Sequence, residues 1–159
     1  MTVRKLHYND DIALHQRCEP VETIDDTIRE TLRDMVDTMY HEDNGAGLAA
    51  CQIGVMKRLV VIDMGEGLIQ LVNPQIVETH GARQCMEGCL SFPDLVGKTI
   101  RPQKVKVEAL NEQGEPITLW GEDDLAMCFC HEIDHLDGIV YLDRATELYR
   151  IVMPEKDTN

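Results

Sequence analysis

The chain has 159 residues, of which 15 are basic and 29 are acidic, so its formal net charge is −14. This length can bury a hydrophobic core without disulfides, and we expect one domain spanning 1–159. The negative charge argues against a nucleic-acid-binding protein, because a phosphate backbone would be repelled.

The N-terminal sequence MTVRKLHYNDD contains no apolar stretch as long as that of a signal peptide. The longest apolar runs, such as LVVI at 59–62, are far too short to span a membrane. We therefore expect a cytoplasmic protein without membrane contact. In a reducing compartment the cysteines are interpreted as thiols or metal ligands. They are Cys18, Cys51, Cys85, Cys89, Cys128 and Cys130.

The first predicted element is an amphipathic helix over 24–40. Thr23, followed three residues later by Asp26, marks its expected start, and the sequence NGAG at 44–47 ends it. The apolar residues recur at helical spacing and form one buried stripe. They are Ile24, Ile28, Leu32, Met35, Val36 and Met39.

Short β-rich segments follow the helix. The sequence predicts strands at 58–64, 68–72 and 75–79, separated by GEG and by Asn73-Pro74. The segment 104–110 alternates apolar and charged residues, as in a half-buried strand, and the turn NEQGEP leads it into a hairpin with ITLW at 117–120.

A second helix is predicted from Glu122 or Asp123 to Leu136, ending at Gly138, and the polar tail after Leu148 is expected to fray. Strands between two helices, joined mostly by short turns, indicate an α+β fold with antiparallel sheets.

The second helix carries the sequence HEIDH. His131 and His135 are four residues apart, so both imidazoles can point toward one ion. Glu132 lies about 100° around the helix and can act as a base without binding the ion. The pattern predicts a metal site, and the alternative is an amphipathic helix with incidental histidines.

Two histidines do not hold an ion, so a third ligand is required. In one zinc-peptidase pattern the third ligand is a histidine at the position of Tyr141, which excludes that pattern. A downstream glutamate would have to be Glu147 or Glu155, close to the end of the chain. Cys128 lies about 7–8 Å along the helix axis from the ion position, and Cys130 points about 100° away from His131. The ligand must therefore come from another segment.

Two glycine-containing segments provide further candidates. EGCLS at 87–91 places the thiol of Cys89 in a short segment between strands, where Gly88 permits close approach of the backbone. GAGLAACQ at 45–52 is rich in small residues, so a peptide backbone could lie along it, and Gln52 offers an amide donor. Either segment alone is also consistent with a structural turn.

Together, GAGLAACQ, EGCLS and HEIDH resemble, in this order, the three motifs of the peptide deformylase family. The resemblance covers nearly the whole chain. It implies antiparallel sheets packed around a central metal-binding HExxH helix, with the N-terminal amphipathic helix beside them. It also implies a hydrolase of N-terminal methionine processing, which removes the formyl group from formyl-methionyl chains and releases formate.

The resemblance implies residue roles. The metal ligands would be Cys89, His131 and His135, and Glu132 would be the catalytic base. The Gln52 side chain and the Leu90 backbone N–H would bind the developing oxyanion. The substrate would contact Ala46, Gly47, Glu87, Gly88, Met127 and Cys128, and Glu87 would pair with Arg101.

The resemblance also implies the cofactor and partners. We expect one divalent ion per chain, Fe²⁺ in the family, with Zn²⁺, Ni²⁺ or Co²⁺ also compatible with imidazole and thiolate ligands. The partner would be a formyl-methionyl nascent chain. The short, weakly basic tail argues against the ribosome docking that some members achieve through a C-terminal helix, although a transient contact stays open. Alternatives are a metallopeptidase cleaving internal bonds and a non-enzymatic relative that only binds the peptide or the ion.

Overall fold

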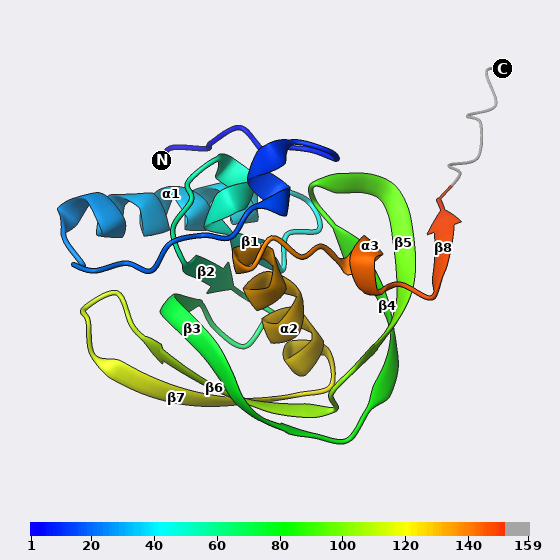
Figure 1. The fold of residues 1–159 in the computed structure, drawn as a ribbon. Coiled ribbons are helices and arrows are strands. Elements are labelled where there is room, and N and C mark those ends of the chain that lie inside the picture. The colour runs from blue at the N-terminus through cyan, green and yellow to red at the C-terminus, as the bar shows by residue number, and fades with distance from the viewer. Residues whose placement is uncertain (152–159) are drawn as a thin grey trace, which may run out of the picture.

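The computed structural model describes residues 1–151. Two antiparallel sheets form most of the protein (Figure 1). The five-stranded sheet has the order β1-β2-β3-β6-β7 and the three-stranded sheet the order β4-β5-β8. The strands are β1 (Gly47–Ala49), β2 (Leu59–Ile62), β3 (Ile69–His80), β4 (Arg83–Cys89), β5 (Phe92–Arg101), β6 (Lys104–Leu110), β7 (Pro116–Glu122) and β8 (Glu147–Arg150). The mixture of antiparallel sheets with few helices agrees with the α+β prediction.

The N-terminal part of the chain precedes and covers the first strands. It contains the short 3-10 helix η1 (Ile12–His15) and the helix α1 (Asp26–His41). α1 starts two residues later than predicted, because the side chain of Asp25, not Thr23, accepts a hydrogen bond from the N–H of Ile28 at 3.0 Å.

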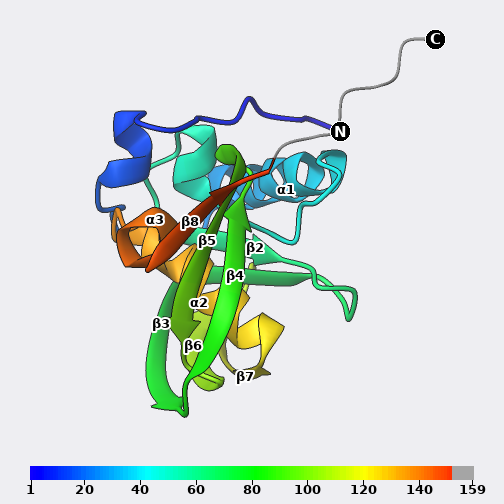
Figure 2. The ribbon, with the colours of Figure 1, turned by 90° about the vertical axis from the view of Figure 1, so that its right-hand side faces the viewer.

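α2 (Asp124–Leu136) lies in the middle of the molecule and carries HEIDH (Figure 1). It packs against β1, β2, β3, β6 and β7 of the larger sheet and against β5 of the smaller one. Figure 2 shows β4, β5 and β8 in front of α2. The helix ends before Gly138, whose φ of 74° reverses the chain direction. The same position leaves no space for a side chain, because an added Cβ would lie 2.9 Å from the backbone of His15.

The chain between Leu68 and Thr79 differs from the prediction. Asn73-Pro74 does not separate two strands: β3 is continuous, and its register with β6 shifts between Val72 and Gln75, across this pair, and again between Ile76 and Glu78. Asn73 adopts a positive φ of 52°, and its side-chain oxygen accepts a hydrogen bond from the N–H of Val21 at 2.8 Å. The bulge therefore ties the N-terminal segment to the sheet without ending the strand.

The C-terminal region also differs from the prediction. Leu148 to Arg150 do not fray, because they belong to β8, which pairs with β5 from Leu95 to Lys98. The short connector η2 (Ala50–Ile53) and the one-turn helix α3 (Tyr141–Arg144) complete the elements. The rest of the predicted tail, 152–159, and any ribosome contact through it lie outside the described residues. Among the helices of residues 1–151, none is long and apolar enough to cross a membrane.

Two groups of buried side chains form the core. One lies around α2 and includes Phe129, Leu136 and Tyr141, all essentially without solvent exposure. The other lies between α1 and the first strands and includes Leu32 and Met35. Residues of α2 and of the 45–52 segment line one cavity.

Candidate metal centre and active site

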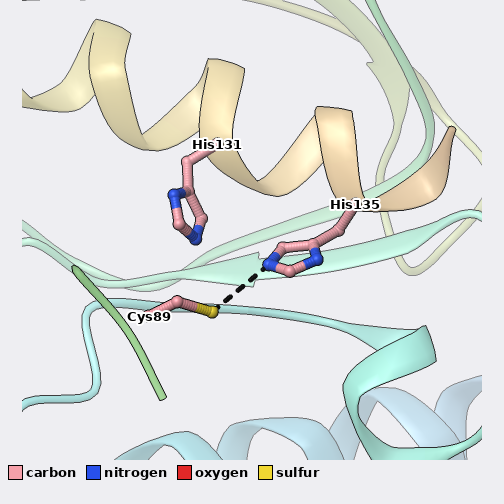
Figure 3. Close-up of side chains that lie close together, drawn as sticks. All are labelled: Cys89, His131 and His135. Atoms are coloured by element: carbon pink, nitrogen blue, oxygen red, sulfur yellow. Dashed lines mark hydrogen bonds between the residues drawn. The ribbon is translucent and has the colours of Figure 1, made fainter. Parts of the chain in front are cut away.

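Three side chains from two elements meet beside α2. Cys89, the last residue of β4, faces His131 and His135 on consecutive turns of the helix (Figure 3). Their ligand atoms all lie within 4.8 Å of one another, and Sγ of Cys89 is 3.4 Å from Nε2 of His135. The third candidate ligand beside the two histidines thus comes from β4, in the three-stranded sheet.

This cluster fits a metal ion of tetrahedral preference. Metal–sulfur and metal–nitrogen bonds of about 2.3 and 2.0–2.1 Å place the donor atoms about 3.4–3.6 Å apart in a tetrahedron. The Cys89–His135 distance already has this value. Three protein ligands leave one coordination position for water or substrate, as in catalytic rather than structural sites.

The carboxylate of Glu87 orients the first histidine. Its Oε1 lies 2.9 Å from Nδ1 of His131, so the ring donates there and presents Nε2 to the ligand cluster. Burial lowers the pKa of His131, but hydrogen bonds to Cys89 and Glu87 outweigh it and raise the pKa well above its ordinary value. Surroundings that hold a proton on this ring also attract a metal cation.

The second histidine has the opposite electrostatic character. Burial, and then the neighbouring His131, lower the pKa of His135 well below its ordinary value. A neutral imidazole is the form that binds metal ions. Among the described residues, its Nδ1 has no hydrogen-bond partner.

Glu87 is itself fixed by a buried ion pair. Arg101 donates to both of its carboxylate oxygens, at 2.7 and 2.9 Å, and Thr99 donates a further hydrogen bond. Burial raises the pKa of Glu87, but the hydrogen bonds from His131 and Arg101 overcome this effect and lower the pKa to about 2. The predicted Glu87–Arg101 pair is therefore present.

The ion-pair network extends further than the sequence indicated. Arg101 also donates to Oδ2 of Asp134 at 2.7 Å, and Arg144 of α3 donates to the same carboxylate at 2.6 and 3.0 Å. Asp134 lies between His131 and His135 in the sequence of α2, and its side chain is directed to Arg101 and Arg144. The network therefore joins β4, β5, α2 and α3 behind the metal centre.

Glu132 is buried beside the ligands without a complete set of partners. It is 3% exposed, its Oε1 lies 3.7 Å from Nε2 of His131, and its Oε2 has no hydrogen-bond partner within 1–151. Burial raises the pKa of Glu132 to about 7, against the opposing effect of His131. A carboxylate with this pKa can accept and return a proton near neutral pH.

The side chain of Gln52 lies next to that of Cys89. Its Oε1 accepts a hydrogen bond from the N–H of Ala49 at 2.9 Å, which orients the amide. Its Nε2 donates to Oγ of Ser91 at 3.1 Å and lies 3.6 Å from Sγ of Cys89. Leu90 follows Cys89 directly, so both proposed oxyanion donors lie next to the ligand cluster.

A cavity of about 680 Å³ opens onto these residues. Its lining includes all six residues expected to contact substrate: Ala46, Gly47, Glu87, Gly88, Met127 and Cys128. Gln52, Cys89, Leu90, His131 and Glu132 line it as well. The structure thus brings all the predicted site residues together, and all of them line the cavity except His135, which is fully buried and joins the ligand cluster.

The two glycines of the cavity differ. An added Cβ at Gly47 would lie 3.0 Å from Sγ of Cys128 and 3.0 Å from Cγ of Glu132, so a side chain there would displace the glutamate. The expected close approach at Gly88 is absent within the described chain: an added Cβ would meet nothing within 4 Å.

Several residues of the site carry no recognisable signal in the sequence. Tyr141 stacks on His131 at 5.8 Å between ring centroids, and its hydroxyl donates to the carbonyl of Leu95 at 2.7 Å. Ser91 supports Gln52, and Asp134 and Arg144 support Arg101. Their roles depend on contacts between segments that are distant in the sequence, and the spacing of residues within one segment does not predict such contacts.

The remaining cysteines are outside the ligand cluster. As the helix geometry predicted, Cys128 and Cys130 are not in the cluster. Both are buried in the core, and burial raises the pKa of both thiols, that of Cys130 to about 11. Cys18, Cys51 and Cys85 are buried free thiols. At the position of the third zinc-peptidase histidine, the structure has the buried ring of Tyr141.

Comparisons with known proteins agree with this geometry. The family model described as "Polypeptide deformylase" matches residues 3–150. The chain belongs to the polypeptide deformylase family. Its members are metal-dependent enzymes that hydrolyse the formyl amide at the N-terminus of nascent polypeptides.

Individual relatives are similar over nearly their whole length. The chain is 54% identical to "Peptide deformylase 2" of Clostridium acetobutylicum over 147 residues, which is 92% of this chain and 98% of that protein. It is 51% identical to the peptide deformylase of Acetivibrio thermocellus over 144 residues, covering 91% of this chain and 84% of the relative.

Solved structures show the same fold. The peptide deformylase of Thermotoga maritima has a TM-score of 0.89 and 36% identity, covering 92% of this chain and all of that one. The peptide deformylase of Synechococcus elongatus in complex with actinonin has a TM-score of 0.87 and 43% identity, covering 90% of this chain and 79% of that one.

Proposed function

We propose that this chain is a metal-dependent deformylase in which Cys89, His131 and His135 hold the ion and Glu132 is the general base. One observation carries the assignment: the buried Glu132 oxygen without a partner lies beside three metal-ligand side chains in a cavity. A structural metal site has no use for such a carboxylate, whereas hydrolysis requires one.

When bound, the ion would polarise the formyl carbonyl and lower the pKa of the attacking water. Glu132 accepts a proton from that water as its oxygen bonds to the formyl carbon. Glu132 then delivers the proton to the methionine nitrogen as the C–N bond breaks, so formate and a free amine leave. The pKa of about 7 suits both transfers.

The chain also provides donors for the formyl oxygen. The amide nitrogen of Gln52 donates one hydrogen bond to Ser91, and its second hydrogen is directed toward Cys89. The backbone N–H of Leu90 belongs to the residue that follows Cys89. Both would stabilise negative charge that develops as the water attacks. Loss of one such donor typically costs about 2.7–4 kcal/mol of transition-state stabilisation.

The methionine side chain is assigned to the apolar part of the cavity. Met127 and Cys128, one turn before His131, line it, as do Phe92 and Leu95 of β5. This composition suits an unbranched thioether, which packs well among apolar and sulfur-containing side chains.

We assign Fe²⁺ as the native ion, following the family resemblance, and the S/N₂ donor set also suits Zn²⁺, Ni²⁺ or Co²⁺. Iron bound by a thiolate is oxygen-sensitive, so aerobic purification would replace it. We further propose one catalytic domain over 1–159, acting in the cytoplasm on nascent chains, with at most a transient ribosome contact.

The test measures formate release from formyl-Met-Ala-Ser by protein purified anaerobically and loaded with Fe²⁺ or Ni²⁺. An unblocked peptide and an internally cleavable peptide serve as controls. Formate from the formylated peptide alone supports the proposal. Cleavage inside a peptide would instead indicate a peptidase, and inactivity of the metal-loaded protein toward all three would indicate a relative that only binds.

A further inference from the structure

Tyr141 is a buried aromatic residue of α3 that lies beside the ligand cluster. In one zinc-peptidase pattern this position of the chain carries the third metal-binding histidine. Here the side chain is 1% exposed, its ring stacks on His131, and its hydroxyl is directed to Leu95 of β5. The position therefore still adjoins the metal centre, although Cys89 takes the place of the third ligand.

The imidazole of His131 is held at its edge and over its face. Glu87 accepts a hydrogen bond from Nδ1 at 2.9 Å, which holds the edge. The ring of Tyr141 covers the face, with 5.8 Å between the ring centroids and 28° between the ring planes. The ring of His135 meets that of His131 at 74°, with 5.0 Å between their centroids. The direction of Nε2 toward the ligand cluster thus depends on Tyr141 as well as on Glu87.

Stacking on Tyr141 should be stronger when His131 binds a cation. The face of a phenol ring carries partial negative charge, and a bound metal draws electron density from the imidazole. An interaction that is stronger in the metal-bound state raises the affinity for the metal. The strength of one stacked aromatic pair corresponds to about two- to tenfold in a binding constant.

The hydroxyl of Tyr141 connects α3 to the wall of the cavity. It donates to the carbonyl of Leu95 at 2.7 Å, and the ring meets that of Phe92 at 81°, with 5.8 Å between their centroids. Phe92, Leu95 and Val96 of β5 all line the cavity. Gly97 permits the close approach, because an added Cβ would lie 3.1 Å from Cδ2 of Tyr141. One side chain thus contacts both a metal-binding histidine and the strand that borders the cavity.

We propose that Tyr141 is a positioning residue with two separable roles. Its ring orients His131 for the metal, and its hydroxyl holds β5 in place for the substrate. The ring role rests on the proposed ligand set, and the hydroxyl role rests on the proposed formyl-methionyl substrate. The first role should be visible in the metal affinity and the second in KM. Tyr141 does not itself line the cavity, so kcat of the metal-loaded protein should change little.

The first experiment measures the dissociation constant of Zn²⁺ by competition with a chromophoric chelator. The unmodified chain is compared with Tyr141→Phe, with Tyr141→Leu, and with a protein that carries pentafluorophenylalanine at position 141. Fluorination makes the ring face electron-poor while keeping the shape of the ring close to that of phenylalanine. The matched control is Phe129→Leu, which removes another fully buried ring, one that packs against Gly121 of β7.

Tyr141→Phe should bind Zn²⁺ as tightly as the unmodified chain, because it keeps the ring. Tyr141→Leu and the fluorinated protein should bind Zn²⁺ about two- to tenfold more weakly. A merely structural role would give the phenylalanine and pentafluorophenylalanine proteins the same affinity, and this outcome would overturn the ring role. The comparison of these two proteins decides the question even if Tyr141→Leu does not fold. A loss in Phe129→Leu as large as that in Tyr141→Leu would also count against the ring role.

The second experiment measures KM and kcat for formyl-Met-Ala-Ser with Ni²⁺-loaded protein. Tyr141→Phe should raise KM about two- to tenfold, the range of one neutral hydrogen bond, and leave kcat nearly unchanged. The control Tyr149→Phe removes the hydroxyl that donates to Glu147 on β8, outside the cavity, and should leave KM unchanged. An unchanged KM in Tyr141→Phe, or an equal rise in Tyr149→Phe, would overturn the hydroxyl role.

The measurements separate this inference from the proposed function. Fluorescence anisotropy of dye-labelled formyl-Met-Ala-Ser measures peptide affinity without turnover, so the hydroxyl role is tested even in an inactive protein. Weaker binding of Zn²⁺ by the fluorinated protein and of the peptide by Tyr141→Phe, without formate release by any protein, would support both roles and refute deformylation. Formate release with unchanged affinities in every variant would support deformylation and refute both roles.

Discussion

Replacement of Glu132 by glutamine removes the proposed base while keeping the shape of the side chain. Because Glu132 lies beside the three proposed ligands and is not one of them, the variant should retain one metal ion per chain. General acid–base catalysis contributes about 10²- to 10⁴-fold, so kcat for formate release should fall by that factor.

The same substitution should change stability in a pH-dependent way. Burial raises the pKa of Glu132 from 4.5 to about 7, so the folded protein holds this proton more tightly than the unfolded chain. Stability from this group is fully present below pH 4.5 and is lost as the pH rises through 7. The loss amounts to about 3 kcal/mol.

Glutamine carries no charge, so Glu132→Gln should escape this loss. In protein stripped of its ion by a chelator, the variant should exceed the unmodified chain by about 3 kcal/mol in unfolding free energy at pH 8 and match it at pH 4.5. Urea unfolding at both pH values measures this difference. Near-normal turnover, or a stability difference independent of pH, would refute the reasoning.

Three further predictions concern the surroundings of Glu132. Cys89→Ala should lose the ion, because two histidines do not hold it; metal analysis after gel filtration measures this, and full occupancy would contradict the ligand set. Gly47→Ala should retain the ion but lose activity, since its Cβ would lie 3.0 Å from Cγ of Glu132; unchanged kcat would contradict the assigned geometry. Arg101→Leu leaves the carboxylate of Glu87 buried without its cation, which should lower the free energy of unfolding by about 3–5 kcal/mol. Urea denaturation measures this loss. A loss below about 1 kcal/mol would show that the network is not essential to the fold.

The periodic elements were predictable because their signals are local. The helix positions and the 104–120 hairpin follow from apolar spacing and turn residues that adjoin one another in the chain. Asn73-Pro74 misled the prediction of β3, because this pair usually ends a strand. Here a bulge absorbs it, stabilised by a hydrogen bond to Val21 from a distant segment.

The site was predictable only in part, because some of its residues are brought together by contacts between distant segments. The spacing of His131 and His135 predicts the metal-binding face of a helix and excludes Cys128 and Cys130, but it does not indicate which of the other four cysteines joins the histidines. That choice came from the resemblance to a family, and the structure places Cys89 there through the pairing of β4 with β5. Asp134 and Arg144 had no signal, because their contacts form only when α3 packs beside α2.

The most direct test of the central claim is a titration of the metal-stripped protein with Fe²⁺ under anaerobic conditions, with formate release from formyl-Met-Ala-Ser as the readout. The structure predicts that activity rises linearly and stops at one ion per chain. Formate release by the stripped protein, or an endpoint other than one ion per chain, would contradict the single Cys89–His131–His135 centre.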